Sequence, residues 1–204
     1  MAELALKCGC GELRGVLRGA SPEHGNHAIC YCDDCQSFAH HLGQRDALDE
    51  RGGTRVYQTY QARVELTEGL DQLRCLRLSP KGLPRWYAGC CRTPVGNTMA
   101  SSGWPFVGLV GTFIAMDDDV LEDAVGPVVA RVHGRFARGG LPPGAHPSAS
   151  VGVIARMVLF LAKGRLTGQH RPSPFFDGDG GLVVEPEVLS RERREELLAQ
   201  VRGG

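Results

Sequence analysis

The placement of cysteine residues constrains this chain more than any other feature. All eight cysteines lie in the first hundred of its 204 residues. Seven of them form three groups: Cys8-Gly9-Cys10-Gly11, Cys30-Tyr31-Cys32-Asp33-Asp34-Cys35 and Cys90-Cys91. An interval of 54 residues separates the second group from the third, so only a folded structure can bring them together. Ligation of a metal by thiolates would hold such distant groups in one place.

The spacing within the first two groups suits a metal site. On an extended chain, residues two apart project on the same side, so the thiols of Cys8 and Cys10 point the same way. Cys30 and Cys32 repeat this spacing at the end of a predicted strand. Cys35 begins a short predicted helix, whose positive N-terminal end lowers the pKa of a nearby thiol. Zinc takes four ligands in structural sites and three in catalytic sites that keep an open position, and seven thiols divide naturally into four and three.

Each cysteine pair alone is a weak signal, because a single cysteine is often a small buried hydrophobic residue. The three groups together predict zinc ligation by seven residues: Cys8, Cys10, Cys30, Cys32, Cys35, Cys90 and Cys91. Cys75 has no cysteine or histidine neighbour in its predicted strand, so we interpret it as a core residue. His40 and His41 follow the short helix, and we interpret them as solvent-facing rather than as ligands.

Charge and hydropathy exclude several classes of protein. The chain has 23 lysine and arginine residues and 23 aspartate and glutamate residues. It also lacks a basic stripe interleaved with aromatic residues, so we do not expect it to bind nucleic acid. The longest uncharged apolar stretch, 104–116, is shorter than the roughly 20 residues of a membrane-spanning helix. The N-terminus lacks the basic flank and apolar stretch of a secretory signal. We therefore expect a cytoplasmic protein with no membrane partner, in which thiols stay reduced and are free to bind metal.

Short stretches rich in β-branched and aromatic residues predict strands at 55–60, 63–67, 73–78, 84–88, 106–115 and 128–133. Asp33 and Asp34 are expected to cap a short helix over 35–41, which ends at Gly43. The glycine- and proline-rich segment 139–147 predicts a loop. The expected organisation is a zinc-binding, mainly β domain over 1–138, with several small antiparallel sheets around zinc, and a loop plus helical extension over 139–204 packed on it.

Two helices are expected in the extension. Over 150–163, apolar residues recur at steps of three and four and predict one buried face, made of Val151, Ile154, Met157, Val158 and Leu161. Ser190 is a good N-cap for a closing helix over 191–201. This tail is a candidate for a lid, for the contact of a homodimer or for scaffolding, and we favour scaffolding.

With these residues assembled, the first hundred positions resemble the glutathione-dependent formaldehyde-activating enzyme family, which includes centromere protein V-like proteins and has the Mss4-like β fold. Three motifs carry the resemblance: the C-x-C at Cys8, the C-x-C-x-x-C at Cys30, and Cys91-Arg92-Thr93-Pro94, which is similar to the family's late C-x-x-C-G-T-P. The similarity looks closest to an uncharacterised, divergent branch.

The resemblance implies two zinc sites. A structural zinc would be held by Cys8, Cys10 and Cys91, with Cys90 as the available fourth ligand. A second zinc would be held by Cys30, Cys32 and Cys35.

This sequence departs from the family pattern in three places. Ala88 stands where the first late cysteine is expected, and the thiol is found at Cys90 instead. Tyr31 stands where the family often has histidine, and the tail after Ser102 is longer than the minimal domain. Cys90 would either complete the first site or turn toward the second cluster and close it, which would remove the open position of a catalytic zinc.

Two functions follow from these alternatives. With an open three-thiolate zinc, the chain would be a carbon-sulfur lyase-like enzyme that handles a small thiol, such as glutathione, and an aldehyde adduct. With both sites closed, it would be a non-catalytic zinc-stabilised structural or interaction module. Three cations near the late cysteines could hold an anionic substrate, but we interpret them as solvated strand-end charges: Lys81, Arg85 and Arg92.

Overall fold

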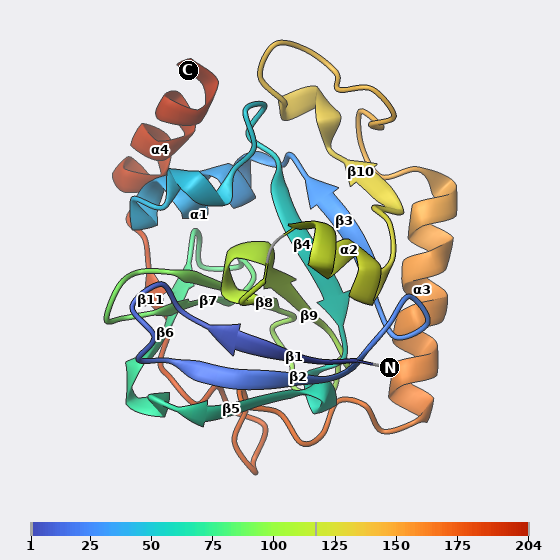
Figure 1. The fold of residues 1–204 in the computed structure, drawn as a ribbon. Helices are drawn as coiled ribbons and strands as arrows, with labels where there is room; N and C mark the ends of the chain where they lie inside the picture. Colours follow the sequence, from blue (N-terminus) through green and yellow to red (C-terminus); the bar gives the residue numbers. More distant parts are fainter. Residues whose placement is uncertain (1, 117, 204) are drawn as a thin grey trace.

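The computed structural model describes residues 2–116 and 118–203 and contains two β-sheets (Figure 1). The smaller sheet has the order β1-β2-β5, with β1 (Ala2–Lys7), β2 (Arg14–Ala20) and β5 (Val64–Glu68). The larger sheet has eight strands in the order β10-β3-β4-β9-β8-β7-β6-β11. Its strands are β10 (Ala130–Val132), β3 (Asn26–Cys30), β4 (Thr54–Thr59), β9 (Val107–Val110), β8 (Pro94–Thr98), β7 (Arg85–Ala88), β6 (Leu73–Arg77) and β11 (Glu187–Val188).

The larger sheet is antiparallel at its centre and parallel at both edges. Strand β10 pairs in parallel with β3, and β11 pairs in parallel with β6. Both edge strands come from the second half of the chain, so this half completes the sheet on which the first half is built. One broad sheet therefore stands in place of the several small antiparallel sheets that we expected.

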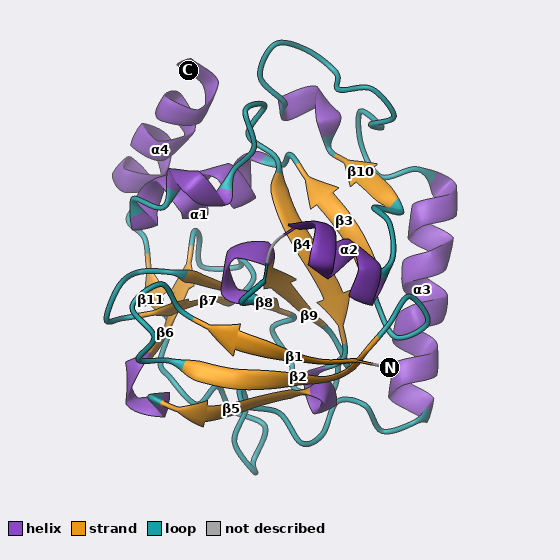
Figure 2. Ribbon diagram, in the orientation of Figure 1, coloured by secondary structure: helices purple, strands orange, loops and turns teal. Residues whose placement is uncertain are grey.

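Four α-helices lie around the sheets in the described part of the chain (Figure 2). They are α1 (Asp33–Leu42), α2 (Asp118–Val125), α3 (Val151–Leu166) and α4 (Arg191–Gly203). The short helix and the two C-terminal helices are confirmed, whereas α2 was not predicted. The chain is rich in strands, as expected, but it is a mixed structure rather than a mainly β one. None of the described helices has the length and apolar character needed to cross a membrane.

The main core lies between the two sheets and includes residues from both halves of the chain. Trp86 in β7 is fully buried, and its indole N–H donates to the Thr98 hydroxyl at 3.1 Å. Phe175, from the segment after α3, packs against the Trp86 ring with 5.0 Å between ring centroids. Cys75 is 3% exposed, which confirms its assignment to the core, and burial raises its pKa to about 12.

The face with which helix α3 packs matches only part of the face that we predicted: Met157 and Leu161 are partly buried, but the other three predicted residues are exposed. Val151, Ile154 and Val158 are 83%, 52% and 58% exposed. The helix instead approaches the body of the protein through Phe160, whose ring stacks on Tyr60 at 4.2 Å, and through Gly164, where a side chain would collide with the Tyr60 ring. The error has a physical cause: α3 is apolar on both faces, so its periodicity predicts a helix but does not decide which face packs.

Helix α4 packs on α1, the helix that begins at the second cysteine cluster (Figure 1). The Ser190 hydroxyl accepts the Arg193 N–H at 3.1 Å, which confirms the predicted N-cap. Leu197 is fully buried in a small cluster with Phe38 and Leu42 of α1. Arg194 and Arg202 form ion pairs with Asp34 and Asp33, at 3.2 and 3.4 Å. This placement fits the scaffolding role that we favoured for the tail.

Candidate metal centres

The first cluster joins two turns that are distant in sequence. Cys8 and Cys10 follow β1, and Cys90 and Cys91 lie in the turn between β7 and β8. Their four Sγ atoms all lie within 4.8 Å of one another. The separations are 3.6 Å for Cys8 and Cys10, 3.8 Å for Cys8 and Cys90, 3.3 Å for Cys10 and Cys90, and 3.9 Å for Cys90 and Cys91. Four sulfurs placed tetrahedrally at about 2.3 Å from zinc would be about 3.8 Å apart, so the cluster has the dimensions of a zinc tetrathiolate.

The conformation of the second turn allows two adjacent cysteines to face one site. The Arg92 N–H donates to the Ala88 carbonyl at 2.7 Å, and the Ala88 N–H donates to the Thr93 carbonyl at 2.9 Å. Between these bonds Arg92 has a φ of 62°, in the left-handed region that favours glycine. Cys90 belongs to this first cluster and leaves the second one with three thiols.

Hydrogen bonds support the sulfur atoms of the first cluster. The Leu13 N–H donates to Cys8 Sγ at 3.3 Å. The Thr93 hydroxyl accepts the Gly9 N–H at 2.9 Å, which leaves its own proton free for Cys91 Sγ at 3.1 Å. Burial raises the pKa of the Cys91 thiol, but the hydrogen bonds from Thr93 and nearby backbone groups outweigh burial and bring this pKa to about 6. This lowered pKa favours the thiolate of Cys91, the form that binds metal.

The second cluster forms where β3 passes into α1. Cys30 ends β3, Cys32 is the N-cap of α1, and Cys35 lies in the first turn of the helix. Their Sγ atoms lie within 4.8 Å of one another, and each residue is partly exposed. The prediction that Asp33 and Asp34 cap the helix was wrong: the Cys32 sulfur accepts the Cys35 N–H at 3.4 Å. A candidate ligand thus also acts as the cap, and the helix begins two residues earlier than predicted.

Arg85 lies against the second cluster, and its interpretation as a solvated charge was wrong. The residue is 6% exposed. Its Nη1 lies 3.8 Å from Cys35 Sγ, its Nη2 lies 3.9 Å from an Asp34 carboxylate oxygen, and its guanidinium lies over the Phe38 ring at 5.5 Å. The cause is that α1 packs over this end of β7, which sequence alone does not show. Lys81 and Arg92 are exposed, as expected.

Arg85 changes the electrostatics of the cluster. Hydrogen bonds from the thiols of Cys30 and Cys32, together with the Arg85 charge, hold the pKa of Cys35 well below its usual value against the opposing effect of burial. Zinc with three thiolates would carry a net charge of about −1, which the single positive charge of Arg85 would balance. The soft sulfur donors and the charge balance both fit zinc.

A narrow cavity lies on the inner side of the second cluster. Its polar lining consists of Cys35, Arg85, Thr54 and Asn97, and its volume of about 10 Å³ is close to the room needed by one water molecule. Thr54 is 4% exposed, and its hydroxyl has no hydrogen-bond partner among the described residues. Anything larger than water must therefore reach these sulfurs from the solvent side.

The histidines near α1 do not join either cluster. Within the described residues, each group placed to hold a metal ion consists of cysteines alone. His40 contacts the Arg138 guanidinium at 3.1 Å, and because arginine only donates, His40 Nε2 is the acceptor. Burial and the charges of Arg45 and Arg138 lower the pKa of His40, which favours its neutral form. The interpretation of His40 as solvent-facing is replaced by a role in fixing Arg138.

Comparison with known proteins adds a family but no activity. A search among curated proteins found no match. The family model that matches the chain is described as a family of unknown function, DUF6151, and it covers residues 1–187. The matched region includes both cysteine clusters, the two sheets and α3. The chain therefore belongs to the DUF6151 family of unknown function.

Proposed function

We propose that this protein is a zinc enzyme that forms or cleaves carbon-sulfur bonds at the three-cysteine cluster, with the four-cysteine cluster as a structural zinc site. The observation that carries the proposal is the division of seven cysteines into a group of four and a group of three. A tetrathiolate site is complete and closed, whereas three protein ligands leave one coordination position for a substrate. The resemblance of the three motifs to the formaldehyde-activating enzyme family supports the same assignment.

Zinc bound at the second cluster would supply a position that holds an incoming thiol as its thiolate. The residues of the chain define that position. Cys30, Cys32 and Cys35 fix it at the start of α1. Arg85 offsets the negative charge of the thiolates from the buried side. The narrow inner cavity excludes larger groups, so the open position faces solvent.

The reaction that fits this site is addition of a thiol to an aldehyde and its reversal. The sulfur of the thiolate attacks the carbonyl carbon, a carbon-sulfur bond forms, and the aldehyde oxygen takes up the proton that the thiol released. A zinc ion with three thiolate ligands is a weak Lewis acid. It would therefore contribute by presenting a nucleophilic sulfur rather than by polarising the carbonyl.

The test begins with elemental analysis and X-ray absorption of the purified protein. We expect two zinc ions per chain and an average of about 3.5 protein sulfurs per zinc, from seven thiolates over two metals. Zinc-loaded protein should then accelerate the loss of free thiol from a mixture of glutathione and formaldehyde, and Cys32→Ser should abolish this acceleration. A single zinc with four sulfur ligands, or two zinc ions without any effect on the thiol, would contradict the enzyme proposal.

One observation favours the second candidate, a non-catalytic zinc module. The cavity beside Cys35 has no room for a substrate on its inner side, and Arg85 already offsets the charge of the cluster without a ligand. In a module, the fourth position of the second site would be filled by a water or by a partner protein. Thiols added to the zinc-loaded protein would then leave its X-ray absorption spectrum unchanged, whereas an open enzymatic site would gain one sulfur per chain.

A further inference from the structure

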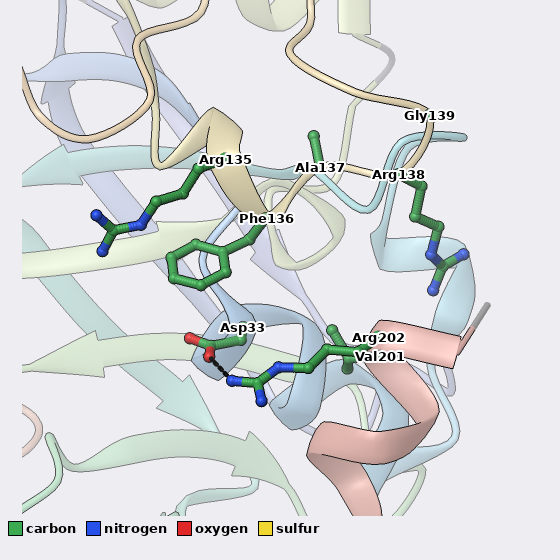
Figure 3. Close-up of a pocket in the computed structure, with 8 residues that line it drawn as sticks. All are labelled: Asp33, Arg135, Phe136, Ala137, Arg138, Gly139, Val201 and Arg202. Atoms are coloured by element: carbon green, nitrogen blue, oxygen red, sulfur yellow. Dashed lines mark hydrogen bonds and ion pairs between the residues drawn. The ribbon is translucent and has the colours of Figure 1, made fainter.

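A second site stands out on the surface where α1, α4 and the segment after β10 meet (Figure 3). This cleft has a volume of about 450 Å³, which is in the range of small-molecule sites. Three arginines line it: Arg135 and Arg138 from the segment after β10, and Arg202 from the end of α4. Figure 3 shows the side chains of Arg135 and Arg138 on opposite sides of Phe136, and Arg202 below them with the Asp33 carboxylate joined to it.

The segment that carries two of these arginines is anchored to the rest of the protein. The Gly134 N–H donates to the His146 carbonyl at 2.8 Å, and the Arg138 N–H donates to the Arg51 carbonyl at 2.9 Å. The buried Gln36 amide donates to the carbonyls of Phe136, at 3.0 Å, and of Tyr31. The cleft is thus part of the folded structure, held to α1 from below, rather than a chance space beneath a loose loop.

The charges in the cleft are unbalanced. In the described part of the chain, no carboxylate pairs with Arg135 or Arg138. Arg202 pairs with Asp33 at 3.4 Å. Three guanidinium groups against one carboxylate leave two excess positive charges in a protein whose formal net charge is zero.

Of the three arginines, Arg138 is the one whose position is best suited to bind a ligand. It is half-buried, and His40 Nε2 accepts from its guanidinium at 3.1 Å. Its Nε lies below the surface with no hydrogen-bond partner among the described residues. A buried donor without a hydrogen-bond partner costs stability unless a ligand accepts from it. Arg138 is therefore held in place by His40, and its Nε–H remains available to donate to a ligand.

We propose that this cleft binds a small organic anion that carries two negative charges, as two carboxylates or as a phosphate ester. Planar guanidinium groups match the paired oxygens of both chemical groups and bind them through two parallel hydrogen bonds. Phe136, Ala137 and Val201 supply apolar contacts for a carbon skeleton. The cleft adjoins the second cysteine cluster, because Asp33 lies between Cys32 and Cys35 in the sequence, but no cysteine lines it. Anion binding there does not depend on the proposed carbon-sulfur chemistry.

Asp33 would compete with the ligand. Its carboxylate already occupies Arg202, so an anion that enters the cleft must share this arginine or displace Asp33 from it. Removal of the Asp33 charge should therefore strengthen binding, whereas removal of an arginine should weaken it. Opposite effects of two neighbouring substitutions are hard to obtain from a general loss of structure.

The test is isothermal titration calorimetry on the full-length, zinc-loaded protein with succinate and with inorganic phosphate as probes. Acetate serves as the singly charged control. We expect saturable binding of at least one probe, weakened by added salt. A preference for succinate would assign the site to dicarboxylates and a preference for phosphate to phosphate esters. Absence of saturable binding for both probes would overturn the proposal.

Variants locate the binding. Arg138→Gln and the exposed Arg135→Gln should each weaken binding roughly tenfold, and Asp33→Asn should strengthen it roughly two- to fivefold. Arg191→Gln, on the same helix as Arg202 but paired with Glu195 away from the cleft, removes the same charge and should leave binding unchanged. Equal weakening in Arg191→Gln and the two cleft variants would show a general charge effect and would overturn the site. Melting curves and zinc content confirm that each variant is folded.

Discussion

The two cysteine clusters differ in how they are built, and the difference matches the division that we propose between a structural site and a reactive one. The four-cysteine cluster ties together two turns about 80 residues apart, and Cys8 is a fully buried member of the main core. The three-cysteine cluster spans only six residues, because β3 runs directly into α1. The first cluster closes a long loop of the chain. The second one lies at the junction of β3 and α1, whose positions are already fixed by the packing of the sheet and the helix. On the proposed assignment, metals bound at the two clusters should therefore contribute very differently to stability.

The largest effect is expected from Cys8→Ser. Serine removes a buried ligand of the four-cysteine cluster, and the binding free energy of a structural zinc is in large part folding free energy. We expect loss of the cooperative thermal transition or a fall in stability of more than about 4 kcal/mol. Circular dichroism melting and zinc content measure this. Cys75→Ala is the matched control, because it removes a buried cysteine that belongs to neither cluster and should keep both metals.

The second-largest effect is expected from a substitution in the three-cysteine cluster. Cys32→Ser should remove one zinc of two and leave the fold intact, at a cost of about 3 kcal/mol from the lost stabilisation by bound metal. Far-ultraviolet circular dichroism should stay as in the wild type. An unfolded Cys32→Ser protein would show that the two clusters are equivalent structural sites, and the distinction between them would fail.

The two clusters also differ in their neighbouring charges. Arg85 is a buried cation beside the three-cysteine cluster, and the four-cysteine cluster has no such cation among the described residues. Arg85→Met keeps the length and apolar stem of the side chain but leaves the cluster with an unbalanced negative charge. We expect weaker retention of the second zinc against a chelator and a loss of about 2 kcal/mol in stability. Arg85→Lys keeps the charge and should retain the metal more firmly than Arg85→Met. Equal zinc retention in both variants would remove the electrostatic role of Arg85.

Sequence reasoning predicted which cysteines gather in these clusters better than it predicted what surrounds the clusters. Cysteine spacing is local and chemically specific, so it predicted all seven thiols that the structure places in two groups. The partner of Cys90 depended on the shape of the β7–β8 turn, which hinges on the left-handed conformation of Arg92. The burial of Arg85 depended on how α1 packs over β7. The burial of Arg85 arises from tertiary packing, and the left-handed conformation at Arg92 is local but is not indicated by arginine as a residue type.

The packing of the C-terminal helices shows the same limit. The apolar periodicity of α3 predicted a helix correctly, yet the exposed Val151 and Val158 show that it identified the contact face only in part. Gly164 was the overlooked signal, since a residue without a side chain marks a point of close approach. For α4, the Ser190 cap was predictable, whereas its position on α1 was not.

The smallest effect, and the only stabilising one, is expected at the turn of the four-cysteine cluster. Arg92 adopts a φ of 62°, which costs free energy for a residue with a side chain. Arg92→Gly should relieve this strain, while the loss of an exposed hydrogen bond to the His41 carbonyl offsets part of the gain. We expect a net increase of about 0.5 kcal/mol in stability, measured by urea unfolding of the zinc-loaded protein. Arg92→Ala loses the same hydrogen bond without relief of strain and should be less stable than Arg92→Gly. If the alanine variant were the more stable, the turn would not be strained, and Cys90 and Cys91 would face one site without help from the conformation at Arg92.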